Sequence, residues 1–83
     1  MPVPTISKRF GLTVRKYRTE AGLTQEALAE RAGLHATYIG MVERGIRNPT
    51  LDVALRISKA LKAELPVLIS KSLPDRGGKG RKG

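Results

Sequence analysis

The chain has 83 residues, with 16 Lys and Arg against 7 Asp and Glu, one His, no Cys and no Trp, and its formal net charge is +9. This length allows one domain, and the lack of Cys excludes a disulfide scaffold, a thiolate-held metal site and a cysteine nucleophile. No apolar stretch approaches the roughly 18–20 residues of a membrane span, and the N-terminus lacks the apolar core of a signal peptide. The sequence therefore predicts a cytoplasmic basic domain without a membrane partner. The charge favours a polyanion as its partner, foremost nucleic acid.

The positive charge divides between a predicted folded domain, residues 1–70, and a predicted tail, residues 71–83. The tail has five basic residues, one acidic residue and four of the nine Gly, so it carries +4, whereas residues 1–70 carry +5. Because the tail has almost no apolar side chains to bury, we expect it to be disordered. Its basic residues either keep it solvated or add non-specific contacts with phosphates.

The first predicted helix has apolar residues along one face and ends near Gly22. Ile6, Phe10, Val14 and Tyr17 recur at the spacing of an α-helix, which predicts that all four pack inward. Tyr17 is therefore interpreted as a core residue and not as a platform on which bases stack.

Two further helices are predicted before residue 46. Thr24 is a suitable N-cap for the first of them, Glu26 lies near the positive end of its dipole, and Gly33 ends it. The next helix covers about residues 35–44 and ends at Gly45. The inward residues of this pair are predicted to be Leu28, Ala29, Ala32, Leu34, Ile39 and Val42.

The C-terminal part of the domain is predicted to hold two more helices. Residues 48–50 form a turn in which Thr50 caps the fourth helix, and a short fifth helix is predicted around residues 66–70, where Pro66 is tolerated in the first turn. Because no stretch alternates long enough for a strand, the chain is expected to be all-α with five short helices. The buried stripe of the fourth helix is predicted to be Leu51, Ala54, Leu55, Ile57 and Leu61.

Residues 24–45 satisfy the steric demands of a helix-turn-helix. Where two helices cross steeply, the first needs a small residue, and Ala29 stands there. The turn needs a residue that accepts a positive φ, and Gly33 follows four residues later. The second helix of such a motif lies in the major groove of DNA while the first crosses the phosphate backbone.

The stretch TQEALAERAGLHATYIGMVERG, followed by NPTLDVALRISKAL, resembles the Cro/C1-type (XRE) helix-turn-helix family of bacterial and phage repressors. Its segments TYI, ERG and RNPTL also resemble the controller proteins of restriction–modification systems. The resemblance covers about residues 8–70. It implies a compact five-helix, lambda-repressor-like domain that binds a palindromic operator as a dimer and regulates transcription. It also implies an ion pair between Arg18 and Glu43, which would join the first helix to the end of the recognition helix.

The candidate DNA-binding residues begin at the second predicted helix and follow the outward face of the third into the next loop. Thr37 can donate to a base or a phosphate, Tyr38 offers a hydroxyl, and Met41 either contacts a thymine methyl group or fills a packing gap. The outward face of the third helix is predicted to be His35, Ala36, Thr37, Tyr38, Gly40, Met41 and Arg44. The predicted DNA-binding site consists of Thr24, Gln25, His35, Ala36, Thr37, Tyr38, Met41, Arg44 and Arg47.

Phosphate contacts are assigned to the two ends of this site. Arg44, at the end of the third helix, is expected to reach a phosphate, and the resemblance implies a backbone contact for Gln25 and a DNA contact for Arg47. Relatives usually have a long polar or basic residue at the position of Ala36, and Ser or Thr at the position of His35. His35 is therefore a DNA contact, a weak cap or an exposed turn residue, and the operator sequence is not predicted.

Apolar residues near the end of the domain exceed what a small monomer covers, so by resemblance we expect a homodimer through Leu65, Val67, Leu68 and Ile69.

Besides a transcription regulator, a second hypothesis for the function is an antitoxin that binds a toxin and represses its own operon. A third is a non-specific nucleic-acid binder. A single His, no Cys and scattered carboxylates argue against an enzyme and a metal site. No cofactor and no small-molecule ligand are expected, and repression is not distinguished from activation.

Overall fold

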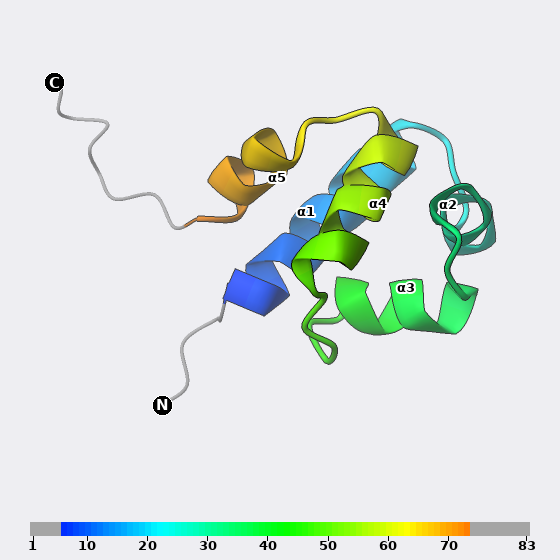
Figure 1. Cartoon of the computed structure of the whole chain (residues 1–83), viewed down its shortest axis with the longest axis horizontal. Coiled ribbons are helices and arrows are strands. Elements are labelled where there is room, and N and C mark those ends of the chain that lie inside the picture. The colour runs from blue at the N-terminus through cyan, green and yellow to red at the C-terminus, as the bar shows by residue number, and fades with distance from the viewer. Residues whose placement is uncertain (1–5, 74–83) are drawn as a thin grey trace, which may run out of the picture.

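Five short helices follow one another along the described part of the chain. The computed structural model describes residues 6–73, which contain no strand. The helices are α1 (Ile6–Glu20), α2 (Gln25–Ala32), α3 (Ala36–Glu43), α4 (Leu51–Leu61) and α5 (Leu65–Ser72) (Figure 1). The predicted all-α fold with five short helices is confirmed. None of these helices is long and apolar enough to cross a membrane.

Side-chain and glycine caps fix the helix boundaries that the sequence predicted. The Thr24 hydroxyl accepts a hydrogen bond from the backbone N–H of Ala27 at 3.0 Å, and the Thr50 hydroxyl accepts one from Val53 at 3.1 Å. Gly33, at the end of α2, has a φ of 72°, a left-handed conformation that glycine adopts at little cost. Both N-caps and the end of α2 at Gly33 are confirmed.

The core lies where the five helices meet. α1 packs against α3, α4 and α5, while α2 packs against α3 and α4. Figure 1 shows α4 in front of α1, with α5 on one side and α2 and α3 on the other. Every helix therefore contributes to one shared core. Its buried residues are Phe10, Val14, Leu28, Ala29, Ala32, Ile39, Val42, Ala54, Ile57, Ala60, Leu61 and Leu68.

Three residues that the sequence predicted to be buried are exposed. The exposed fractions are 46% for Ile6, 80% for Leu51 and 43% for Leu55, so these three predictions are wrong. Ile6 and Leu51 are the first residues of their helices, where the neighbouring helices no longer cover them, and Leu55 lies one turn after Leu51 on the same side of α4. Tyr17 and Leu34 are half-buried and pack against the core, in agreement with their predicted inward direction.

The fifth helix extends beyond the predicted end of the folded domain. Lys71 and Ser72 belong to α5, and Ser72 is buried. The Ser72 hydroxyl donates to the carbonyl of Leu68 at 2.6 Å and lies 3.2 Å from the hydroxyl of Thr13 on α1. The predicted boundary after residue 70 therefore falls inside a helix. The remainder of the predicted tail, from residue 74, and residues 1–5 lie outside the described residues.

Candidate nucleic-acid interface

α2 and α3 are joined by a three-residue turn and meet through small and apolar side chains. The backbone N–H of Leu34 donates to the carbonyl of Ala29 at 2.8 Å, which closes the turn together with the left-handed Gly33. Ala29 and Ile39 are both buried where α2 packs against α3. The helix-turn-helix predicted for residues 24–45 is therefore present.

The close approach of α1 to α3 depends on Gly11. A Cβ atom at this position would lie 2.1 Å from the carbonyl oxygen of Val42 and 2.7 Å from that of Glu43, far inside van der Waals contact. Only a residue without a side chain fits between these two backbones. The sequence prediction did not single out Gly11. The available signal was a glycine in a helix interior, which costs stability unless a packing reason compensates for it.

A buried ion pair ties α1 to the end of α3. Arg18 Nε donates to Glu43 Oε2 at 2.6 Å, and Arg18 Nη2 donates to Glu43 Oε1 at 3.0 Å. Arg18 Nη1 also donates to the carbonyl of Leu23 at 2.8 Å. The hydrogen bond with Glu43 raises the pKa of Arg18 while burial lowers it, and the net shift is upward, so the guanidinium stays charged. The pairing that the resemblance implied is confirmed.

Gln25, the first residue of α2, belongs to the same network. Its Nε2 donates to Glu43 Oε1 at 3.0 Å. Gly40 is buried and lies next to this amide. A Cβ atom at Gly40 would be 3.5 Å from Gln25 Oε1. The prediction that Gly40 faces outward is therefore wrong. The sequence also did not predict the bond between Gln25 and Glu43, since these residues are 18 positions apart and no local pattern connects them.

The predicted site residues fall into an exposed group and a half-buried group. His35 occupies the N-cap position of α3 but makes no capping hydrogen bond with its side chain, so the capping alternative is excluded. Ala36 and Tyr38 pack partly against the core, and their predicted outward direction is only partly correct. The exposed residues are Thr24, His35, Thr37, Arg44 and Arg47, and the half-buried ones are Gln25, Ala36, Tyr38 and Met41.

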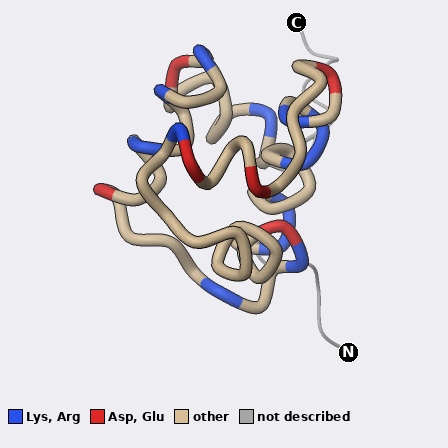
Figure 2. Tube along the Cα trace, turned by 90° about the vertical axis from the view of Figure 1, so that its right-hand side faces the viewer, with Lys and Arg blue, Asp and Glu red and all other residues tan. Residues whose placement is uncertain are grey.

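α3 contributes little charge to its own surface. Its one charged residue is the buried Glu43, and the exposed Arg44 follows directly after the helix. α3 lies at the lower edge of the molecule in Figure 1, so one side of the helix is open to solvent. Figure 2 shows Lys and Arg interspersed with Asp and Glu over residues 6–73. Within this range, no group of three or more His, Asp or Glu side chains is placed to hold a metal ion.

Comparison with known proteins identifies the family. The profile of the family described as "Helix-turn-helix" matches residues 14–68. The chain is 50% identical to control protein C.SmaI of Serratia marcescens over 58 residues, which are 70% of this chain and 69% of that protein. The chain belongs to the XRE-type helix-turn-helix family.

Two further similar proteins show the range of this similarity. The crystal structure of the restriction-modification controller protein C.AhdI from Aeromonas hydrophila has a TM-score of 0.72 and 44% identity, over 74% of this chain and 92% of that one. An uncharacterised HTH-type transcriptional regulator of Mycobacterium tuberculosis is 41% identical over 58 residues, and the match covers only 41% of its length. These relatives give no support to the antitoxin alternative.

Proposed function

We propose that the chain is a sequence-specific DNA-binding regulator of transcription and not an enzyme. The observation that carries the proposal is the open side of α3, on which Thr37 is exposed and which Arg44 and Arg47 follow. The buried pair of Arg18 and Glu43 holds this helix against α1. A rigidly held helix with one open side fits the major groove of DNA. The similarity to a control protein and to a restriction-modification controller supports a controller of that kind.

In this proposal, sequence is recognised from the open side of α3. Thr37 and the hydroxyl of Tyr38 contact base edges, and Met41 contacts a thymine methyl group. Arg44 and Arg47, at the C-terminal end of the helix and in the following loop, contact phosphates and so fix the position of the helix in the groove.

The N-termini of α2 and α3 provide the remaining contacts. The Gln25 amide has two N–H groups, and because one donates to Glu43, the other is available for a phosphate oxygen. The unpaired backbone N–H groups at the start of α2, beside Thr24, favour the same anion. His35 and Ala36 lie at the N-terminus of α3, which is the end of a recognition helix that approaches the bases.

The regulator is proposed to bind a palindromic operator as a homodimer through α5. Val67 and Ile69 are 39% and 36% exposed, and Leu65 beside them is half-buried. Leu68 is 0% exposed and belongs to the core, so its assignment to the dimer interface is wrong, because it has no surface to offer a second subunit. Two-fold symmetry would place the recognition helices one turn of DNA apart, about 34–36 Å. By occupying a promoter, the dimer then represses or activates transcription from it.

Thr37→Ala and Arg44→Ala test the site. We expect Thr37→Ala to weaken operator binding by up to about tenfold with little change on random DNA, because a single hydrogen bond is worth roughly 0.5–1.5 kcal/mol. Arg44→Ala should weaken binding to both DNAs and reduce the salt slope by about 1, because it removes a phosphate contact. The measurement is fluorescence anisotropy over a range of salt concentrations, with an operator selected from random duplexes by the wild-type protein.

The control for these variants is Lys59→Ala, which removes an exposed cation from the far end of α4 and should leave both affinities unchanged. Equal losses on operator and random DNA for Thr37→Ala would contradict its role as a base reader. An affinity ratio near one between operator and random DNA for the wild-type protein would contradict the proposed function itself.

Ile69→Asp tests the dimer. A charge on the exposed side of α5 should weaken self-association at least tenfold, because the carboxylate would be buried without a partner. Leu12→Asp is the matched control, since Leu12 is 58% exposed on α1 and lies outside the proposed interface. Sedimentation equilibrium at tens of micromolar protein measures both. A monomeric wild-type protein under these conditions, or equal effects of the two variants, would contradict the α5 interface.

A further inference from the structure

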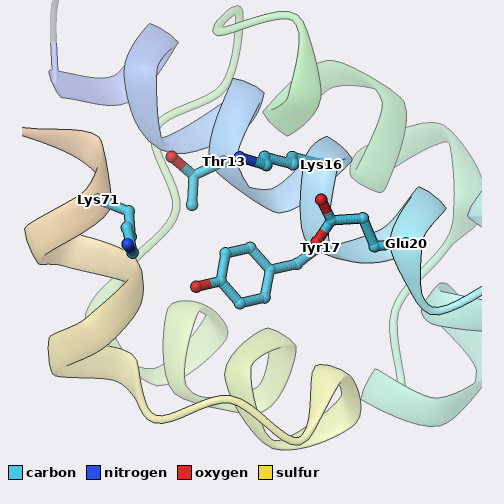
Figure 3. A pocket seen from close by; sticks show the side chains of 5 residues that line it. All are labelled: Thr13, Lys16, Tyr17, Glu20 and Lys71. Atoms are coloured by element: carbon cyan, nitrogen blue, oxygen red, sulfur yellow. The ribbon is translucent and has the colours of Figure 1, made fainter.

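A hollow of about 330 Å³ lies between α1 and α5. Four of its lining residues, Thr13, Lys16, Tyr17 and Glu20, come from α1, and the fifth, Lys71, comes from α5 (Figure 3). α5 and α3 lie on opposite sides of the view in Figure 1, so the hollow is separate from the candidate nucleic-acid interface. Its volume is at the lower end of the range for pockets that bind small molecules.

The hollow brings together hydrogen-bond donors from two helices. Lys16 and Lys71 are exposed lysines, and neither forms an ion pair with any residue between 6 and 73. Figure 3 shows the Tyr17 side chain lying across the hollow with its hydroxyl directed toward α5, where Lys71 is located. Glu20 is the one carboxylate in the lining. The lining therefore carries two positive charges, one negative charge and a neutral hydroxyl.

The two sides of the hollow meet at two buried residues, Thr13 of α1 and Ser72 of α5. Their hydroxyl oxygens lie 3.2 Å apart, while the Thr13 hydroxyl donates to the carbonyl of Arg9 at 3.0 Å. Ser72 is 1% exposed and directly follows Lys71 in the chain. The backbone at Lys71 is therefore fixed relative to α1 before any ligand arrives, which lowers the entropic cost of binding.

We propose that this hollow binds the phosphate group of a small phosphorylated molecule. Lys16 and Lys71 contact phosphate oxygens from the two sides, and the Tyr17 hydroxyl donates to a third oxygen. A phosphate monoester carries close to two negative charges near neutral pH and has three acceptor oxygens, which matches two ammonium groups and one hydroxyl. A carboxylate is a poorer match, because it offers only two acceptor oxygens to the three donor groups. No small-molecule ligand was predicted from the sequence, in which Lys16 and Lys71 lie 55 positions apart.

The test is a titration of the isotope-labelled protein with inorganic phosphate, followed by amide NMR shifts, with chloride keeping the ionic strength constant. We expect saturable shifts at residues 16, 17, 20 and 71. Lys16→Gln and Lys71→Gln should each raise the apparent Kd for phosphate at least fivefold. Lys59→Gln, a control in which an exposed lysine of α4 is removed, should leave this Kd unchanged. The two lining lysines are exposed, so neither substitution disturbs the core.

Three outcomes would overturn the proposal. The first is a set of shifts that grow without saturation, and the second is a set of saturable shifts confined to α2 and α3. The third comes from a parallel titration with a random DNA duplex: if the duplex shifts residues 16, 17, 20 and 71 and phosphate does not, the lysines contact the DNA backbone and not a small molecule. Since the proposed DNA site is monitored by different amides, failure here leaves the proposed function untouched.

Discussion

Arg18→Ala is expected to lower the free energy of unfolding by about 3–5 kcal/mol, because it leaves the Glu43 carboxylate buried without its cation. The Glu43 side chain is 3% exposed and the Arg18 side chain 12%, so water cannot replace the lost partner. For a domain of this size the loss corresponds to a fall in Tm of at least roughly 12 °C, measured by circular dichroism. The carbonyl of Leu23 also loses its donor, which adds to the effect.

The chain contains a matched control for this prediction. Arg56 and Asp52 form a second ion pair, at 3.4 Å, but their side chains are 52% and 74% exposed. Arg56→Ala should therefore cost about 0.5 kcal/mol or less. Replacing both buried partners, as Arg18→Met with Glu43→Leu, should recover most of the loss, because no uncompensated charge remains. An unchanged Tm for Arg18→Ala would show that the pair does not stabilise the fold.

The elements that the sequence predicted well depend on interactions between near neighbours in the chain. Thr24 and Thr50 cap helices through hydrogen bonds that span three residues, so the local sequence contains all the information needed. The apolar face of a helix is equally local, and Phe10 is buried as predicted. Leu51 and Leu55 were predicted incorrectly because an apolar stripe indicates which side of a helix can be buried and not how far the neighbouring helices extend.

The candidate site shows the same division. Thr37 and Arg44 are exposed on the helix-turn-helix as the spacing predicted. The position of the Gln25 side chain depends on its hydrogen bond with Glu43, and the burial of Gly40 depends on its contact with Gln25. Both contacts join α2 to α3. Helix packing fixes them, so spacing within one helix could not predict them. This explains why the exposure of Thr37 and Arg44 was predictable and the surroundings of Gln25 and Gly40 were not.

Gly11→Ala is the second substitution with a large expected effect. It should lower the free energy of unfolding, whereas the same substitution in an isolated helix would raise it. In an exposed helix interior, Ala in place of Gly stabilises by about 0.5–1 kcal/mol. Here the added methyl group would lie 2.1 Å from the carbonyl oxygen of Val42, and this oxygen belongs to a backbone that cannot rotate away. α1 and α3 must therefore move apart. We expect a net loss of about 3 kcal/mol, at the upper end of the usual cost of overpacking, and a Tm lower by roughly 12–24 °C.

Gly40→Ala separates this steric effect from helix propensity. Gly40 lies in the interior of α3, and a Cβ there would have its nearest neighbour, Gln25 Oε1, at 3.5 Å, an ordinary contact distance. The propensity gain should remain, so Gly40→Ala should leave Tm unchanged or raise it by a few degrees. Both variants add the same methyl group to a helical glycine, and differ in what that group meets. If both raised Tm, the separation of α1 and α3 would have to be larger than the structure shows. A loss for Gly11→Ala alone would establish that α3 is positioned by direct contact between its backbone and that of α1.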